Sequence, residues 1–256
     1  MRANYHSHTV RCHHAAGTER EYVERAVEGG LSILGFSDHT PYIYDKPGFV
    51  SPVRMLPEEL TDYVAVLEGL RGEYGGRLEV RIGLEAEYFP RLFSRLLELA
   101  RGAGVEYLIL GQHFLDDDCD GGYTAMPTAD RQFLDRYVSQ SIEGLQTGCF
   151  TYFAHPDVIH FTGGKAEYDR QMRRLCRAAK DCGVPLEINL LGLREGRHYP
   201  DLRFWRVAAE EGNPVVLGSD AHRPRDVWDP ETERRALEIV DSLGLPLLET
   251  VELRRL

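Results

Sequence analysis

The chain has 256 residues, of which 43% are hydrophobic and 28% charged, and its formal net charge at pH 7 is −11. These values are typical of a globular protein and exclude a fibrous or disordered chain. The excess of acidic residues disfavours a protein that binds nucleic acid through clustered cationic side chains, and it suits a small cationic or zwitterionic substrate better.

Short apolar segments alternate about seven times with longer segments of helical periodicity, which is typical of a parallel β/α protein. In chain order, the predicted strands cover residues 3–6, 32–36, 78–83, 107–111, 151–154, 185–189 and 214–218. The predicted helices cover residues 19–29, 57–74, 90–103, 128–147, 167–183, 201–212 and 231–243, and Thr128 is the predicted cap of the fourth.

No linker, low-complexity run or charge block divides the sequence, so we expect residues 1–256 to form one domain. The length matches the roughly 250 residues of a (β/α) barrel. A doubly wound open sheet is the alternative that the pattern alone allows. The polar residues favour the barrel, because nearly every predicted strand runs directly into a His, Asp or Glu, and barrels collect their chemistry at the C-terminal ends of many strands.

Histidines and carboxylates follow the predicted strands too regularly to be scattered surface residues. His6 and His8 leave the first strand two residues apart, so both side chains project to the same side in extended geometry. Five further apolar runs end in a possible metal ligand, at His39, Glu85, His113, His155 and the Asp220/His222 pair. Imidazoles and carboxylates without thiolates are the ligands of Zn, Mn or Fe in hydrolytic sites. Eight or nine such ligands exceed what one ion uses, so two or three ions are predicted.

Seven ordered motifs between residues 6 and 222 resemble those of the polymerase and histidinol phosphatase (PHP) superfamily. They are His6-x-His8, Cys12-His13-His14-Ala15, Ser37-Asp38-His39, Gly83-Leu84-Glu85, Gly111-Gln112-His113, His155-Pro156-Asp157 and Gly218-Ser219-Asp220-Ala221-His222. The segments 54–55, 83–88, 186–189, 192–194 and 199–200 look like the histidinol-phosphate phosphatase branch. The resemblance implies a distorted (β/α)7 TIM-like barrel with a metal site at the C-terminal ends of the strands.

The resemblance also implies three divalent metal ions, which Zn, Fe or Mn would supply according to availability. By resemblance, the first ion is held by His6, His8, Glu85 and Asp220, the second by Glu85, His113 and His155, and the third by His14, His39 and His222. Of these ligands, Glu85, Asp220 and His222 are also assigned to catalysis. His14 is preferred to its neighbour His13 because it stands eight residues after His6, as the family motif requires.

The reaction implied by the resemblance is hydrolysis of L-histidinol phosphate to L-histidinol and phosphate, a step of histidine biosynthesis. Clustered cations lower the pKa of a bridging water toward about 7 and neutralise phosphoryl oxygens during in-line attack. The sequence has neither a GxSxG motif nor a P-loop for a covalent or nucleotide-dependent route.

Two kinds of residue are candidates for contacts beyond the metal ligands. The candidates for binding the substrate are Arg194, Arg197 and His198 after the sixth strand, His160 after the fifth, and Glu87 for the amine. The candidates for orienting the metal-binding imidazoles are Asp38, Gln112 and Asp157.

Two alternatives keep the metal site but change its use. One is a PHP-type phosphoesterase acting on nucleotides or other small phosphoesters. The other is a metal-binding module without turnover, which is disfavoured because every expected ligand position carries a competent residue.

The sequence also bears on the compartment. No uncharged apolar run approaches the roughly 18 residues of a membrane span, and the first residues lack the apolar stretch of a signal peptide. The five scattered cysteines offer neither a CxxC clip nor a disulfide framework. We therefore expect a cytoplasmic protein with a small phosphomonoester as its partner, and nothing in the sequence indicates an oligomeric state.

Overall fold

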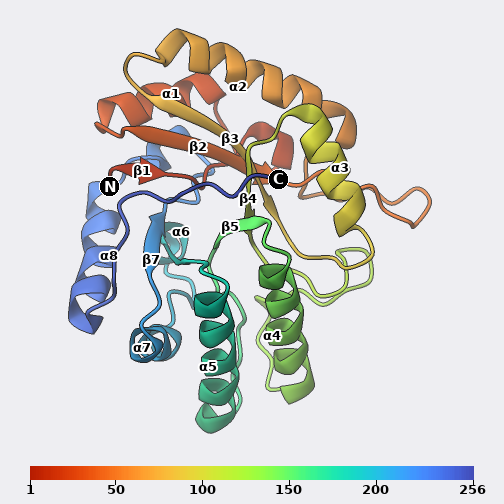
Figure 1. The fold of residues 1–256 in the computed structure, drawn as a ribbon, viewed down its shortest axis with the longest axis vertical. Coiled ribbons are helices and arrows are strands. Elements are labelled where there is room, and N and C mark those ends of the chain that lie inside the picture. Colours follow the sequence, from red (N-terminus) through yellow and green to blue (C-terminus); the bar gives the residue numbers. More distant parts are fainter.

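The computed structural model describes residues 1–256 and contains seven parallel strands that pair in chain order (Figure 1). They are β1 (Ala3–Asn4), β2 (Ile33–His39), β3 (Glu79–Ala86), β4 (Tyr107–Leu110), β5 (Phe150–Phe153), β6 (Leu186–Asn189) and β7 (Val215–Gly218). All seven predicted strands are confirmed. The order β1 to β7 contains no switch point, so the doubly wound alternative is excluded.

The helices lie outside the sheet and agree with the predicted segments. They are α1 (Glu19–Glu28), α2 (Leu60–Tyr74), α3 (Phe93–Ala103), α4 (Arg131–Gln146), α5 (Lys165–Asp181), α7 (Leu202–Glu211) and α8 (Pro230–Leu243). None of these helices combines the length and apolar character that crossing a bilayer requires.

Four short helical segments were not predicted as separate elements. They are the six-residue α6 (Leu190–Glu195) and the 3-10 helices η1 (Val10–Cys12), η2 (Pro57–Glu59) and η3 (Pro224–Asp226). Such segments are too short to display a helical period in the sequence.

The predicted cap of α4 is wrong. Asp130, not Thr128, caps this helix, because the Asp130 side chain accepts a hydrogen bond from the Gln132 N–H. Thr128 instead pairs with Phe161 in an isolated parallel bridge.

The barrel closes just beyond the ends of β1 and β7. Ser7 and Ala221 form a parallel bridge, the His8 N–H donates to the Ala221 carbonyl at 2.9 Å, and the Ala221 N–H donates to the His6 carbonyl at 3.3 Å. The predicted distorted seven-stranded barrel is thereby confirmed. Ser7 stands between His6 and His8, and Ala221 stands between Asp220 and His222. Closure of the barrel therefore brings the predicted ligands near the start of the chain next to those that follow β7.

An inner layer of aromatic side chains fills the barrel. The Tyr107 hydroxyl of β4 donates to the Tyr5 carbonyl at 2.8 Å, so this side chain crosses the interior to the opposite strands. Tyr107 and Tyr5 belong to a small buried cluster that also contains Ala3, Ile109, Tyr152, Ala154 and Val216. The polar residues at the C-terminal ends of the strands therefore rest on a buried, largely apolar layer.

Candidate metal centre

All nine predicted metal ligands lie together at the C-terminal ends of six strands, β1 to β5 and β7. Their nitrogen and oxygen atoms form groups in which the atoms lie within 4.8 Å of one another. The groups are His6/His8/Glu85, His6/His155/Asp220, His39/Glu85/His113 and His14/His39/His222. Because the groups share members, they form one continuous cluster of possible ligands.

Glu85 of β3 stands at the middle of this centre. Its carboxylate is 1% exposed, with Oε1 2.8 Å from His155 Nε2 and Oε2 3.1 Å from His39 Nδ1. Three further imidazoles have a nitrogen 3.6–3.7 Å from the carboxylate, those of His6, His8 and His113. A Cβ atom at Gly111 would lie 2.0 Å from Oε1, so only glycine there leaves room for the carboxylate. Glu85 therefore belongs to two of the groups that could hold an ion, one with His6 and His8 and one with His39 and His113.

Asp220 supplies the second carboxylate, from the segment that follows β7. Its Oδ1 lies 3.1 Å from His8 Nε2, 3.6 Å from His6 Nε2 and 3.3 Å from His222 Nδ1. The backbone φ of Asp220 is 47°, and that of His155 is 31°. Both values lie in the left-handed region that non-glycine residues rarely adopt, and such backbone strain concentrates at functional sites.

Several buried atoms of the centre have no hydrogen-bond partner. They include His6 Nε2, His8 Nε2, Glu85 Oε2 and Asp220 Oδ1. A buried polar atom without a partner destabilises a protein by about 1–3 kcal/mol, so native structures rarely contain such atoms without a reason. Imidazole nitrogens and carboxylate oxygens that converge in this way fit divalent metal ions.

The ionisation of the carboxylates favours bound cations. Burial alone would raise the pKa of Glu85, but the imidazoles of His113, His6 and His39 hold it well below its usual value. The pKa of Asp220 is also well below its usual value, because His6, His8 and His222 outweigh the effect of burial. Both side chains are therefore anionic at neutral pH.

The imidazoles divide into two kinds. Burial lowers the pKa of His39 well below its usual value and that of His222 to about 3, so both rings are neutral. Burial acts in the same direction on His8, but Asp220 and Asp38 outweigh it and raise the pKa of His8 to about 9. Burial is likewise outweighed at His6, whose pKa rises well above its usual value through Glu187, Asp220 and Glu85. The carboxylates thus favour the positively charged form of His6 and His8.

The structure distinguishes His14 from His13. The His14 Nδ1–H donates to the Cys12 carbonyl at 2.7 Å, which leaves Nε2 free, and the ring lies 4.8 Å from that of His222. His13 ends η1 with a φ of 67°, is exposed, and belongs to none of the ligand groups. Of the two neighbours, only His14 joins the centre.

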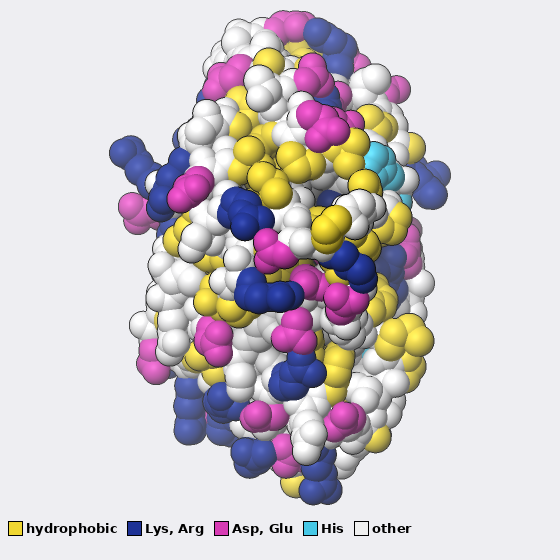
Figure 2. Space-filling view, turned by 90° about the vertical axis from the view of Figure 1, so that its right-hand side faces the viewer, with side chains coloured by type: hydrophobic (Ala, Val, Ile, Leu, Met, Phe, Trp, Pro, Cys, Tyr) yellow, Lys and Arg dark blue, Asp and Glu magenta, His cyan; other side chains and the backbone are white.

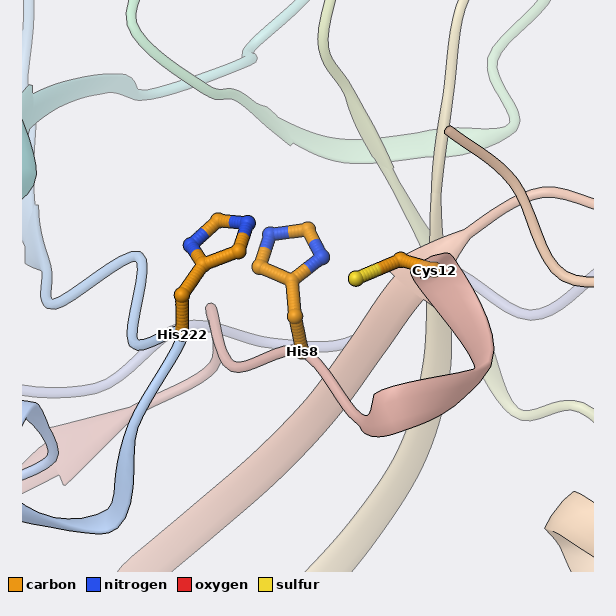
Figure 3. A group of neighbouring side chains, drawn as sticks. All are labelled: His8, Cys12 and His222. Carbon is orange, nitrogen blue, oxygen red and sulfur yellow. The ribbon is translucent and has the colours of Figure 1, made fainter. Parts of the chain in front are cut away.

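Cys12 lies beside the centre, although no cysteine was predicted to take part. The rings of His8 and His222 stack with centroids 4.2 Å apart, and Cys12 points its sulfur toward His8 from η1 (Figure 3). Burial raises the pKa of the Cys12 thiol, which donates to the Thr9 carbonyl at 3.1 Å. Cys12 also forms a group of possible ligand atoms with His8 and His222, which the predicted ligand sets do not include.

Glu187 of β6 orients a predicted ligand and was missed at the sequence level. It accepts a hydrogen bond from His6 Nδ1 at 2.8 Å and another from Asn189 Nδ2 at 2.8 Å. A Cβ atom at Gly218 would lie 2.2 Å from its Oε2. The sequence did contain a signal for it: Glu187 lies between Leu186 and Ile188, in the one predicted strand to which no metal ligand was assigned. Glu187 directs the opposite nitrogen of His6 into the centre.

Of the three residues predicted to orient imidazoles, only Asp38 contacts one. Its Oδ1 lies 3.5 Å from His8 Nδ1. Asp157 accepts from the Trp205 indole at 2.9 Å, and Gln112 bonds to backbone groups of Tyr88 and Phe114. The last two side chains stabilise loops near the centre.

A cavity of about 490 Å³ lies over the centre, and two of the five predicted substrate-binding residues, Glu87 and Arg197, line it. The remaining three lie outside its wall. Arg194 donates to the Ser219 carbonyl at 3.2 Å, and the stacked rings of His160 and His198 lie 4.2 Å apart. Figure 2 shows the face toward which the loop after β2 projects, where acidic, basic and hydrophobic side chains intermingle and little histidine surface is visible.

Fold and site together define a parallel β/α barrel whose C-terminal strand ends carry a cluster of histidines and carboxylates that could hold metal. The chain belongs to the PHP domain family, whose model matches residues 4–190. The superfamily predicted from the seven motifs is thereby confirmed.

Named relatives agree with the branch that the sequence resembles. The chain is 32% identical over 238 residues to the probable histidinol-phosphatase of Deinococcus radiodurans, covering 87% of this chain and 86% of that one. It is 26% identical over 256 residues to the histidinol-phosphatase of Bacillus subtilis, and the match covers 87% of this chain and 94% of that one.

A solved structure shares the fold. The histidinol phosphate phosphatase of Lactococcus lactis, crystallised with zinc, L-histidinol and phosphate, superposes with a TM-score of 0.74. It is 20% identical in sequence, and the match covers 98% of each chain.

Proposed function

We propose that this protein is a metal-dependent phosphomonoesterase that hydrolyses L-histidinol phosphate to L-histidinol and phosphate. The observation that carries the proposal is the centre of nine ligand side chains, several with unpaired buried atoms, beneath a cavity of about 490 Å³. The substrate is supported by the names of the relatives and by the ligands of the Lactococcus lactis structure. All these residues belong to one barrel, so we infer one catalytic domain over residues 1–256.

We infer three divalent ions, with the ligand sets expected from the resemblance. The His14/His39/His222 group supports the third set, and the contacts of Glu85 with His155 and His113 support the second. When bound, such ions lower the pKa of a water molecule and neutralise phosphoryl oxygens. The protein itself contributes the anionic carboxylates of Glu85 and Asp220 and imidazoles that hydrogen bonds hold in place, as Glu187 holds His6.

Arg197 is the proposed phosphate-binding residue. Its guanidinium lines the cavity and donates hydrogen bonds to the Tyr199 hydroxyl at 3.0 Å and to the Glu195 carboxylate at 2.9 Å. The ring centroid of Tyr199 lies 6.0 Å from that of His155, so these contacts hold the guanidinium beside the predicted ligands. The planar guanidinium matches the geometry of phosphate oxygens.

Glu87 is the proposed partner of the substrate ammonium. It lines the same cavity, and its Oε2 is buried without a hydrogen-bond partner. An acceptor in this position suits a cationic group, so Arg197 and Glu87 together recognise the two ends of a zwitterionic phosphoester.

Phosphate release from a panel of substrates tests the proposal. The metal-loaded enzyme should hydrolyse L-histidinol phosphate with a higher kcat/KM than p-nitrophenyl phosphate or nucleoside monophosphates, because only the first offers an ammonium to Glu87. Equal efficiency on all three would replace the biosynthetic reaction with the alternative of a general phosphoesterase for nucleotides and small phosphoesters. No turnover of any phosphomonoester would refute both.

The proposed third ion gives a matched pair of variants. His14→Ala should lower both the metal content and kcat, because it removes one of three imidazoles that converge on that ion. His13→Ala changes an exposed neighbour outside the centre and should leave both quantities unchanged. Metal analysis of the purified variants, together with steady-state kinetics, checks the pair. If His13→Ala lowered both quantities and His14→Ala did not, His13 would be the ligand in place of His14.

Arg197→Ala should weaken catalysis without loss of metal. A charge-assisted hydrogen bond to phosphate contributes about 1.5–3 kcal/mol, so kcat/KM should fall roughly 10- to 150-fold. Arg234→Ala on α8, where the side chain is 63% exposed, is the control and should behave as wild type. An Arg197→Ala enzyme with unchanged kcat/KM would show that another group binds the phosphate.

A further inference from the structure

Arg54 is a buried cation that the proposed reaction does not yet use. It lies between β2 and α2, is 2% exposed, and lines the cavity. Its guanidinium lies over the rings of Tyr42 and Phe89, at 5.3 and 5.7 Å from their centroids. Burying a charge is costly unless it is paired and hydrogen-bonded, so its partners are informative.

Two buried carboxylates hold this guanidinium. Arg54 Nη2 lies 2.7 Å from Glu87 Oε1, and Arg54 Nε lies 2.9 Å from Asp118 Oδ2. The two acidic side chains are 1% and 3% exposed. Because the carboxylates bind different nitrogens of one planar group, their separation is set by the shape of the guanidinium.

Each carboxylate also makes a second contact. Glu87 Oε1 accepts a hydrogen bond from His113 Nδ1 at 2.9 Å, and Asp118 Oδ2 accepts one from the Ser51 hydroxyl at 2.7 Å. Arg54 therefore connects the segments that follow three neighbouring strands: its own after β2, that of Glu87 after β3, and that of His113 and Asp118 after β4.

The contact with Glu87 decides which nitrogen of His113 faces the metal centre. With Nδ1 directed at Glu87, the other nitrogen, Nε2, lies 3.7 Å from Glu85 Oε1 within the His39/Glu85/His113 group. A metal-binding imidazole is held in this way when its second nitrogen donates to a carboxylate. Here that carboxylate is itself held by a buried arginine.

We propose that Arg54 is a positioning residue of the metal centre: through Glu87 it orients the His113 imidazole, and through Asp118 it anchors the loop that carries His113. This inference rests on the proposed metal-dependent function, because it assigns His113 to a bound ion. It also explains why the cavity wall carries a buried arginine that directs two of its nitrogens at carboxylates.

Zinc titration of four proteins tests the inference. The wild type, Arg54→Gln, Arg54→Lys and Arg91→Gln are stripped of metal, then titrated with zinc in a chelator buffer that sets the free concentration. The number of bound ions and the free zinc at half-saturation are recorded, with circular dichroism as the check on folding. Arg91→Gln is the matched control, because Arg91 is 68% exposed and pairs with Asp117, the neighbour of Asp118.

Arg54→Gln should need about 10- to 100-fold more free zinc to fill one of its sites, the range typical for loss of an outer-shell partner. The remaining sites should fill as in the wild type, and excess zinc should restore kcat. Arg54→Lys keeps the charge but not the fork that holds two carboxylates, so it should need several-fold more zinc. Arg91→Gln should match the wild type.

The inference is overturned if the folded Arg54 variants fill every site at the wild-type concentration of free zinc. Should Arg54→Gln fail to fold, Arg54→Lys decides by the same measure. The titration does not depend on turnover. A wild type that binds zinc without hydrolysing L-histidinol phosphate would refute the proposed substrate and leave the test of Arg54 intact.

Discussion

Glu85→Gln is expected to abolish turnover and to lower the metal content while leaving the barrel folded. The carboxylate lies within 3.7 Å of a nitrogen of five histidines, and glutamine keeps its size but removes the charge and adds two N–H donors. Charge stabilisation by metal ions is worth several kcal/mol in a transition state, so kcat/KM should fall about 1,000-fold or more.

Glu79→Gln is the control for this variant. Glu79 begins the same strand, β3, but its side chain is exposed at the opposite end of the barrel. It should retain wild-type kinetics and metal content. Steady-state phosphate release and metal analysis of both variants decide the matter, and near-normal activity of Glu85→Gln would show that another carboxylate bridges the ions.

Removal of metal is expected to abolish activity and to lower the thermal stability. The centre buries two anionic carboxylates and several unpaired nitrogens, and bound cations compensate them only in the folded state. A ligand at 100 times its Kd stabilises the folded state by about 2.7 kcal/mol per site. For a chain of this length that corresponds to a rise in Tm of roughly 5–10 °C.

Dialysis against a chelator, followed by return of zinc under calorimetry, measures this effect. Activity and Tm should recover together as three ions bind per chain. Magnesium, which prefers a shell of oxygen ligands, should restore neither. A fully active preparation with one bound ion, or with none, would contradict the trinuclear centre.

The periodicity of the sequence was sufficient to predict the seven strands and seven of the helices. Buried parallel strands consist of short apolar runs, and each amphipathic helix repeats every 3.6 residues, so both signals are local. The prediction was wrong where a local alternative competed, as at Thr128, since Asp130 two residues later caps α4. It missed α6, whose six residues are capped by Asn189.

The positions of the ligand candidates were predictable for a different reason. Parallel strands of a barrel end on one face, so His39, Glu85 and His113, each at the end of a strand, meet there without further information. The choice of His14 over His13 came from the family motif. The structure agrees with that choice, because His14 belongs to a group of possible ligands with His39 and His222, whereas His13 belongs to none.

What the sequence by itself determined is the succession of strands and helices along the chain, the family and the set of residues brought together at the strand ends. What only the tertiary structure decided is the partner of each side chain: Glu187 against His6, Arg54 between Glu87 and Asp118, and Arg194 outside the cavity wall. The physical reason is that strand and helix formation depend on neighbours along the chain. Hydrogen bonds between loops depend instead on the closure of the barrel, which sets residues as distant as Ser7 and Ala221 side by side.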